Sequence, residues 1–408
     1  MKPKNIRLAL VASILALAGT GVAAPAQVIL PEVAPETLGL DSAVLDKIDA
    51  TVAGGIAGGL FPGAVVCIGR HGKIAFLRAY GNRVVAAGNL PAKPMTTDAV
   101  FDIASITKPM ATATSIMILY ERGMMESLDD PVCKYLAEYN APEIRKKITL
   151  RQLLTHTSGL GGRVPKNTPP APAPAVAPDE LPAAPRDEII YTLTRVPARE
   201  PGSAFHYTGT NMDVLAILLE RLDGRDISTF ANAEIFRPLG MAETGFLPGK
   251  KLRERAAPTR ENLWDAGKVY DPSTVRKQGV AGAAGVFSTA RDLAVFATMM
   301  LHNGRLPGGA RILKPETVAL MTTAGAGAAS VRCLGWEAGP GYTTKMSPRS
   351  FAHGGHNGTR LQMDPGSGLF VIFLSNRTHQ KSGAPEAART KVYQLAGAVG
   401  NLAVESIK

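Results

Sequence analysis

A serine and a lysine, Ser105 and Lys108, stand three residues apart in "FDIASITKPMATATSIMILYERG", where a helix is expected to begin. Residues at this spacing share a helix face, so the two side chains can touch. A serine hydroxyl becomes a good nucleophile only when a neighbouring base takes its proton, and a lysine can be that base if burial or positive charge favours its neutral form. The positive end of a helix dipole favours both the alkoxide and the neutral amine. The pair therefore indicates acyl transfer to a serine.

A structural explanation of the same residues stays open at this point. About one SxxK pair is expected by chance in a chain of this length and composition, so the motif alone is a hypothesis. A serine at a helix start can cap free backbone N–H groups, and Pro109 is tolerated in a first turn. No other lysine in the chain has a serine three residues before it.

Tyr207 is a further candidate, in "PGSAFHYTGTNMDVLA" just before an expected helix. A phenol there could share a proton with Lys108 and serve the leaving group. The alternative is a half-buried tyrosine that only packs.

A glycine-rich turn that leads into a strand, "HGGHNGTRLQMD", supplies the last candidates: His353, Gly354, Gly355 and His356. Glycines let a backbone approach a ligand closely. The N–H groups of His356 and Ser105 could then form an oxyanion hole. We expect these four residues to bind substrate.

Other chemistries find little support in the residues. The chain has no GxSxG, HExxH or GxxxxGK[ST] motif. His156, in "LLTHTSGL", is expected to pack near the site rather than act as a base. We expect no metal and no organic cofactor.

The composition is that of an ordinary globular protein of 408 residues, 45% hydrophobic and 19% charged. Residues 1–23 carry Lys2, Lys4 and Arg7, then an apolar run over residues 8–18 and small residues. This pattern predicts a secretory signal peptide, cleaved after Ala23 or Ala26, because the run is too short to span a bilayer. The mature protein is expected to be secreted or periplasmic, without a stable membrane span.

Charge and cysteines exclude further classes of protein. Removal of residues 1–23 lowers the formal charge from +11 to +8, and the remaining basic residues are scattered, which disfavours nucleic-acid binding. Cys67, Cys133 and Cys333 are too few for a disulfide framework or a metal cluster, and at most one disulfide can form. Cys67 is expected to be a small buried hydrophobe.

Hydrophobic periodicity places the elements that must position these residues. A helix capped by Asp41 and Ser42 and a hairpin turning at His71 and Gly72 are expected first. A short helix within residues 147–160 is expected to end at a glycine, and residues 166–185, rich in Pro and Ala, are expected to form an exposed loop. Further helices are expected at residues 211–224, 227–236, 290–304 and 386–402, and strands at residues 359–364 and 368–375.

These elements predict an α+β fold, an α/β sandwich. An antiparallel β-sheet flanked by helices is built from both chain ends, and a mostly helical lobe is inserted. The α/β lobe is expected at about residues 38–115 and 275–400, and the helical lobe at about residues 116–274. A cleft between the lobes is the natural place for a site.

Taken together, "SITK", "YTG" and "HGG" in this order resemble the three motifs of the penicillin-recognising serine hydrolases, which include class C β-lactamases, D-alanyl-D-alanine peptidases of the HxG type and related esterases. Stretches such as "LLTHTSGL", "IFRPLGMAETGF" and "MDPGSGLFVIFLSNR" extend the resemblance from about residue 38 to about residue 400. The resemblance implies a β-lactamase/transpeptidase-like fold. It also implies that Ser105 is acylated, that Lys108 accepts its proton, that Tyr207 shuttles protons, and that the HGG strand docks substrate.

The chain departs from the family pattern at two positions. Gly209 stands where these enzymes usually carry Asn or another polar residue, and Asn211 is two residues out of register. His353 stands where a lysine would supply a fixed positive charge for a lactam carboxylate. Arg360 could replace that charge, although a surface role is expected for it. Both departures favour a neutral ester.

We therefore predict an exported serine hydrolase that forms an acyl-enzyme through Ser105 and hydrolyses carboxylic esters or related acyl compounds. One alternative is a D-amino-acid peptidase of the penicillin-binding type, or a weak β-lactamase, acting on peptidoglycan-like amides. The other is a non-catalytic binding member of the fold. The sequence leaves the physiological substrate and the oligomeric state open.

Overall fold

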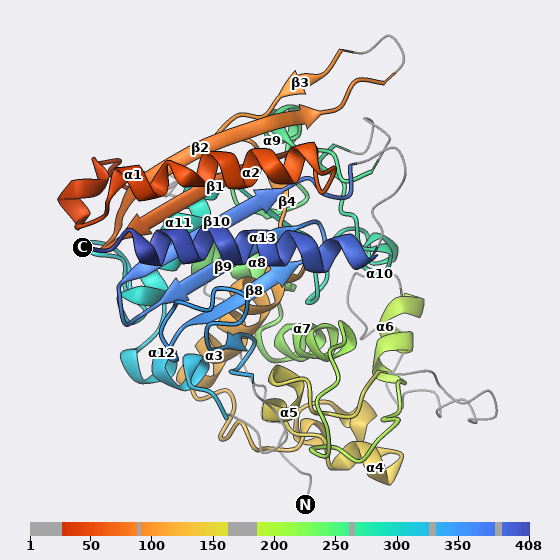
Figure 1. The fold of residues 1–408 in the computed structure, drawn as a ribbon. Coiled ribbons are helices and arrows are strands. Elements are labelled where there is room, and N and C mark those ends of the chain that lie inside the picture. The colour runs from red at the N-terminus through yellow and green to blue at the C-terminus, as the bar shows by residue number, and fades with distance from the viewer. Residues whose placement is uncertain (1–26, 88–90, 162–185, 261–265, 326–331, 380–385) are drawn as a thin grey trace, which may run out of the picture.

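The computed structural model describes residues 27–87, 91–161, 186–260, 266–325, 332–379 and 386–408 (Figure 1). The predicted signal peptide, residues 1–23, and the predicted loop, residues 166–185, lie outside the described residues. None of the described helices is long and apolar enough to cross a membrane.

An antiparallel sheet joins the two ends of the chain. Its central pair is β1 with β10, which places Val66 opposite Phe373. Both strands are continuous apolar runs, "GAVVCIG" and "LFVIFLS", because helices cover both faces of the sheet. The seven strands run in the order β3 (Lys93–Pro94), β2 (Lys73–Val84), β1 (Gly63–Arg70), β10 (Leu369–Ser375), β9 (Thr359–Asp364), β8 (Phe351–Gly355) and β7 (Glu337–Ala338). The predicted α+β fold with a sheet built from both chain ends is confirmed.

The predicted hairpin between β1 and β2 turns at His71 and Gly72. Both residues are left-handed, with φ of 52° and 76°. Positive φ at both central positions gives the turn whose twist matches the flanking strands. The register of β1 and β2 follows from this turn, with Arg70 opposite Lys73.

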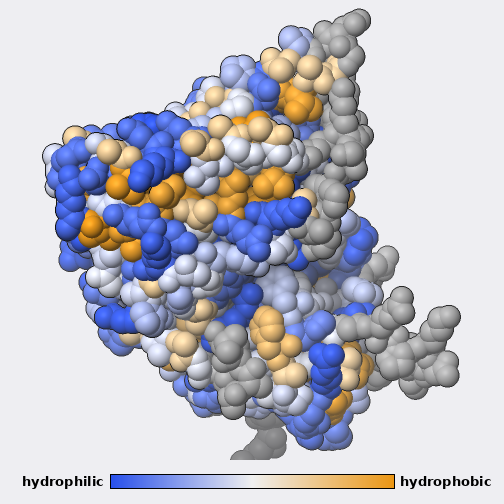
Figure 2. Space-filling view, in the orientation of Figure 1, coloured by the Kyte–Doolittle hydropathy of each residue, from blue (hydrophilic) through white to orange (hydrophobic). Residues whose placement is uncertain are grey.

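Helices cover the sheet on both sides. Side chains that alternate along β1 enter two different cores, Val66 and Ile68 on one face and Val65 and Cys67 on the other. The first face packs against α1 (Ser42–Leu45), α2 (Lys47–Ala57) and α13 (Glu386–Glu405), and α11 (Ala290–Leu301) packs on the other. Figure 2 shows apolar side chains gathered between α2 and α13. Burial raises the pKa of the Cys67 thiol, as suits the buried hydrophobe expected there.

A small second sheet has the strand order β4 (Phe101–Asp102), β6 (Val286–Ser288) and β5 (Gly245–Phe246). Most of the helices follow β4 in the chain. The lobe boundaries proposed from the sequence stay a prediction. The remaining α-helices are α3 (Thr114–Glu121), α4 (Glu143–Lys146), α5 (Leu150–Leu154), α6 (Arg186–Leu193), α7 (Thr210–Asp223), α8 (Ile227–Ala231), α9 (Lys250–Arg255), α10 (Pro272–Arg276) and α12 (Pro315–Thr322).

The helix predicted within residues 147–160 is shorter than expected. It begins at a capping box formed by Thr149 and Gln152 but ends at Leu154, not at a glycine. His156 has a φ of 57°, and its carbonyl accepts the N–H of His206 at 2.8 Å. The chain thus leaves the helix early because the backbone of residues 156–159 bonds to the segment that leads to α7.

Candidate active site

The predicted nucleophile and base are in contact. Lys108 Nζ lies 2.9 Å from Ser105 Oγ and donates a second hydrogen bond of 2.8 Å to the carbonyl of Ala283. The Lys108 side chain is buried, with an exposed fraction of 3%. When the amine is neutral, the same contact lets the hydroxyl pass its proton to Nζ. The pair can therefore generate a serine nucleophile.

The turn that carries Ser105 differs from the expected helix start. Ala104–Ile106 form a 3₁₀ turn, Lys108–Ala113 form a π-helical turn, and α3 begins only at Thr114. The N-cap residues of these two turns are Ile103 and Thr107, and Ser105 lies inside the first turn, so the capping explanation is wrong for this serine. π-turns within helices occur frequently at functional sites.

The carboxylate of Asp102 forms a hydrogen bond to the backbone of this turn. One of its carboxylate oxygens accepts the N–H of Ala104 and the other the N–H of Tyr270, both at 2.8 Å. Ala104 has a φ of 49°, a strained value for a residue with a side chain. Burial raises the pKa of Asp102 to about 6, against the lowering effect of the two N–H donors. The buried carboxylate fixes the strained residue immediately before the nucleophile.

Tyr207 lies beside the pair, at the entrance to α7. Its ring centroid is 5.0 Å from Lys108 Nζ, 4.6 Å from the His156 ring and 6.1 Å from the His353 ring. The Tyr207 side chain is 39% exposed, so its hydroxyl can reach both solvent and a bound substrate. The structure thus places the Tyr207 ring beside the Lys108 amine, and the shuttle role stays a prediction.

His156 is buried behind Tyr207. Its Nδ1 lies 3.1 Å from the Asn211 amide nitrogen. Burial, followed by the charges of Arg332 and Lys108, holds the pKa of His156 well below its usual range. A neutral, buried imidazole that supports the tyrosine fits the packing role expected for it.

The HGG residues are a strand rather than the expected turn. His353, Gly354 and Gly355 belong to β8, and the turn begins at His356. A Cβ added at Gly355 would lie 2.4 Å from the carbonyl oxygen of Ile103. Only glycine allows β8 to lie this close to the nucleophile turn.

Two kinds of contact hold His356 in place, one at its carbonyl and one at its ring. Arg377 donates from Nε at 3.1 Å and from Nη2 at 2.6 Å to the carbonyl of His356. The His356 ring stacks on Tyr270 with a centroid distance of 5.2 Å. These contacts hold the residue whose N–H is the predicted second oxyanion donor. The peptide unit that carries this N–H is held through the Gly355 carbonyl, which accepts the Tyr393 hydroxyl at 3.0 Å.

A cavity of about 650 Å³ unites the candidates. Of the predicted site residues, Gly355 does not line this cavity. The wall includes the others: Ser105, Lys108, Tyr207, His353, Gly354 and His356. Gly209 also lines it and offers no side-chain amide, whereas Asn211 is buried and accepts the hydroxyl of Ser158 at 2.6 Å.

Arg332 adds a guanidinium to the cavity wall, where it lies 3.8 Å from Glu337, whereas Arg360 does not line the cavity. Arg332 was not singled out in the sequence, yet it lines the cavity with its guanidinium 5.2 Å from the Tyr207 ring centroid. Arg360 is not at the surface, and that expectation is wrong. It lies in β9 under α13, is 1% exposed, and pairs with Glu337 at 2.9 Å. Burial and the charges of Arg332 and Lys108 hold the pKa of His353 well below its usual range.

Metal chemistry has no visible support in the described ranges. Among those residues no group of three or more His, Cys, Asp and Glu side chains is placed to hold a metal ion.

Gly355→Ala should slow labelling of Ser105 by a fluorophosphonate about 100-fold, because the added methyl pushes β8 away from the nucleophile turn. Gly245→Ala is the matched control, since a Cβ at Gly245 meets no atom within 4 Å. Thermal melting of both variants separates this local effect from unfolding. Equal labelling rates in the two folded variants would show that the close approach of β8 is not needed.

Comparisons with known proteins agree with this geometry. The Beta-lactamase family model matches residues 48–395. A protein of Escherichia coli O157:H7, provisionally named D-alanyl-D-alanine carboxypeptidase, is 29% identical over 93% of this chain and 93% of its own.

Solved structures share the fold. EstCE1, described as a hydrolase with promiscuous acyltransferase activity, is 25% identical over 86% of this chain and 99% of its own, with a TM-score of 0.63. A penicillin-binding protein homologue from Caulobacter crescentus is 19% identical over 88% of this chain and 99% of its own, with a TM-score of 0.65. With its family model matched over most of its length, the chain belongs to the beta-lactamase family, whose members are serine hydrolases.

Proposed function

We propose that the protein hydrolyses carboxylic esters through an acyl-enzyme on Ser105. The observation that carries this proposal is the 2.9 Å contact between Ser105 Oγ and the buried amine of Lys108. Lys108 takes the hydroxyl proton as Oγ attacks the ester carbonyl carbon, and the N–H groups of Ser105 and His356 face the developing oxyanion. The alcohol leaves with a proton delivered through Tyr207, and water then releases the acid and restores the serine.

Esters are favoured by what the cavity lacks. Gly209 offers no amide to hold a substrate amide, and His353 is buried and neutral where a lysine would attract a lactam carboxylate. An ester also has a better leaving group than an amide. The described activity of the similar EstCE1, a hydrolase, supports the same class of reaction.

Ser105→Ala should lower kcat/KM for nitrophenyl butyrate at least about 1,000-fold, because no other group replaces the nucleophile. Lys108→Met should lower kcat/KM by nearly the same factor, since the serine then lacks its base. Ser42→Ala, on the helix α1, is the control and should retain wild-type turnover. Ester hydrolysis that survives in folded Ser105→Ala would overturn the proposal.

A second candidate is a peptidase that releases a C-terminal D-amino acid. Arg332 favours it, because a guanidinium at the cavity wall can bind a free carboxylate. The name of the 29% identical Escherichia coli protein points to the same substrate class. Arg332 would then supply the charge that His353 does not.

Arg332→Gln distinguishes the two candidates. If the substrate is a peptide ending in D-Ala-D-Ala, the variant should raise KM for that peptide about tenfold, the loss of one charge-assisted contact. KM for the same peptide amidated at its C-terminus, and for nitrophenyl butyrate, should change less than about twofold. A wild-type enzyme that releases no D-alanine contradicts the peptidase and leaves the esterase.

Export is also a proposal. The charged, apolar and small-residue pattern of residues 1–23 supports secretion or a periplasmic location. The N-terminal residue of the mature chain tests it: a start after Ala23 or Ala26 supports export, and retention of the leader contradicts it.

A further inference from the structure

The second hydrogen bond of the catalytic amine leads to a residue outside the three motifs. Lys108 Nζ donates to the carbonyl of Ala283, in the segment between α10 and β6. The N–H of Ala283 in turn donates to Asp213 Oδ1 at 3.2 Å. Asp213 lies in the first turn of α7 and is 6% exposed. A buried carboxylate thus fixes the orientation of the peptide unit that ends at Ala283.

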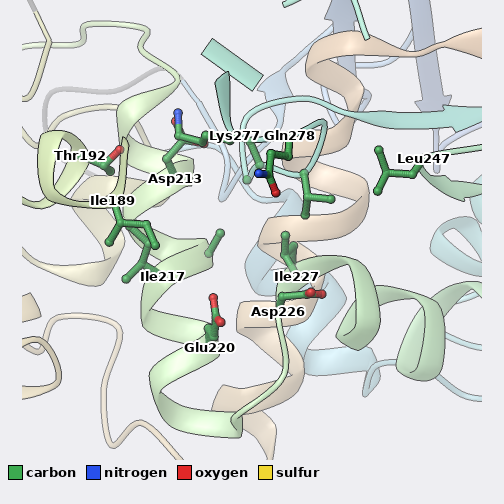
Figure 3. Close-up of a pocket in the computed structure, with 14 residues that line it drawn as sticks. Ile189, Thr192, Asp213, Ile217, Glu220, Asp226, Ile227, Leu247, Lys277 and Gln278 are labelled. Atoms are coloured by element: carbon green, nitrogen blue, oxygen red, sulfur yellow. The ribbon is translucent and has the colours of Figure 1, made fainter. Parts of the chain in front are cut away.

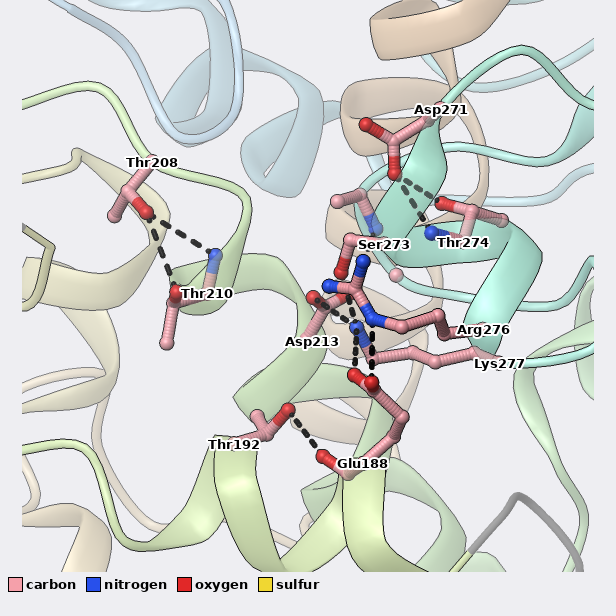
Figure 4. Close-up of polar contacts among 12 residues, drawn as sticks. Glu188, Thr192, Thr208, Thr210, Asp213, Asp271, Ser273, Thr274, Arg276 and Lys277 are labelled. Carbon is pink, nitrogen blue, oxygen red and sulfur yellow. Dashed lines mark hydrogen bonds and ion pairs between the residues drawn. The ribbon is translucent and has the colours of Figure 1, made fainter.

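Asp213 has a cationic partner. Its Oδ2 accepts from Lys277 Nζ at 3.1 Å, and the Lys277 side chain is 8% exposed. Lys277 also donates to Ser273 Oγ at 2.7 Å and lies 3.9 Å from Glu188. Figure 4 shows Lys277 reaching toward the carboxylates of Asp213 and Glu188. Burial raises the pKa of Asp213, and Lys277 opposes this effect.

Packing alone does not account for the pair. Asp213 and Lys277 line the catalytic cavity and also a second cavity of about 250 Å³, whose walls include Ile189, Ile217 and Ile227 (Figure 3). A buried ion pair adds little to stability compared with apolar residues of the same size. Where the pair borders these cavities it has no packing partner, and its hydrogen bonds hold it in place.

The charges of Asp213 and Lys277 offset each other near Lys108. A lone carboxylate near Lys108 would favour the ammonium, which cannot accept a proton from serine. The cation of Lys277 cancels that effect and leaves the hydrogen bond to Ala283 intact. The titratable or charged groups around Lys108 include Asp213 with Lys277 behind it, Tyr207, His156, His353 and Arg332. The same cavity is also lined by Asp271, Arg276, Glu337 and Arg389.

We propose that Asp213 and Lys277 are positioning residues for the catalytic lysine. Asp213 binds the N–H of Ala283, and the carbonyl of the same residue, in the following peptide unit, holds Lys108 against Ser105. Lys277 neutralises the carboxylate that fixes Ala283. The inference rests on the proposed function, because it assigns the support of the same nucleophile and base.

The pH profile of fluorophosphonate labelling tests this pair. In Lys277→Met no cation offsets the charge of the Asp213 carboxylate. The acidic limb of the pH profile, where the labelling rate falls as the pH is lowered, should therefore move upward by about one pH unit. The double variant Asp213→Asn/Lys277→Met keeps an oxygen for the Ala283 N–H and has no net charge, so its limb should return to the wild-type position. A merely structural role does not predict this return.

Asp213→Ala removes the hydrogen bond as well as the charge. It should lower kcat for nitrophenyl butyrate about 10- to 100-fold at every pH, because Lys108 loses its alignment with Ser105. KM should change less than about twofold, because the substrate-binding site is unaltered. Asp213→Asn should recover most of this kcat.

Arg221→Met is the matched control, since it also removes the cation of an ion pair that involves α7, in this case a partly buried one. Arg221 pairs with Glu138 at 2.8 Å, away from the catalytic cavity. It should lower the melting temperature without moving the acidic limb. A limb that stays in place in folded Lys277→Met, while labelling still depends on Ser105, overturns this inference alone. Labelling that does not depend on Ser105 overturns the proposed function as well.

Discussion

The contact between a buried lysine amine and a serine hydroxyl is the constraint on which the site depends. Lys108 is an amine with almost no access to water, and its two hydrogen-bond acceptors are Ser105 Oγ and the carbonyl of Ala283. A buried polar group needs hydrogen-bond partners within the protein, because water cannot satisfy it there. The surrounding structure must therefore hold two acceptors within reach of Nζ at fixed positions.

Separate parts of the chain supply those positions. The nucleophile turn follows β4, Tyr207 stands at the entrance to α7, Ala283 precedes β6, and Gly355 ends β8. Strand β8 of the main sheet lies directly against the nucleophile turn, although β4, which precedes that turn, belongs to the small sheet. The absence of a side chain at Gly355 then allows the strand and the turn to meet. The fold is thus the means by which Ser105 and His356, 251 positions apart, line one cavity.

Much of this arrangement could be predicted from local sequence signals. The hairpin followed from His71 and Gly72, the long helices from apolar periodicity, and the Ser105–Lys108 contact from a spacing of three residues. These signals are local, since each depends on neighbours a few positions away.

The rest depended on tertiary contacts that no local pattern encodes. Arg360 was expected at the surface from sequence but is buried, because β9 lies under α13 and Glu337 neutralises its charge. Arg332 and the Asp213–Lys277 pair had no motif to mark them, and the pair joins residues 64 positions apart. The early end of α5 at Leu154 likewise came from hydrogen bonds to a distant segment.

Intact-protein mass spectrometry tests the central claim most directly, because it detects the covalent intermediate itself. Wild-type protein and Ser105→Ala are each quenched with acid after brief incubation with penicillin G or with a nitrophenyl ester, and peptides are mapped. The account predicts an added acyl mass on the peptide that contains Ser105, from at least one of the two compounds, and none in the variant. Turnover without any adduct on that peptide, or an equal adduct in Ser105→Ala, would contradict it.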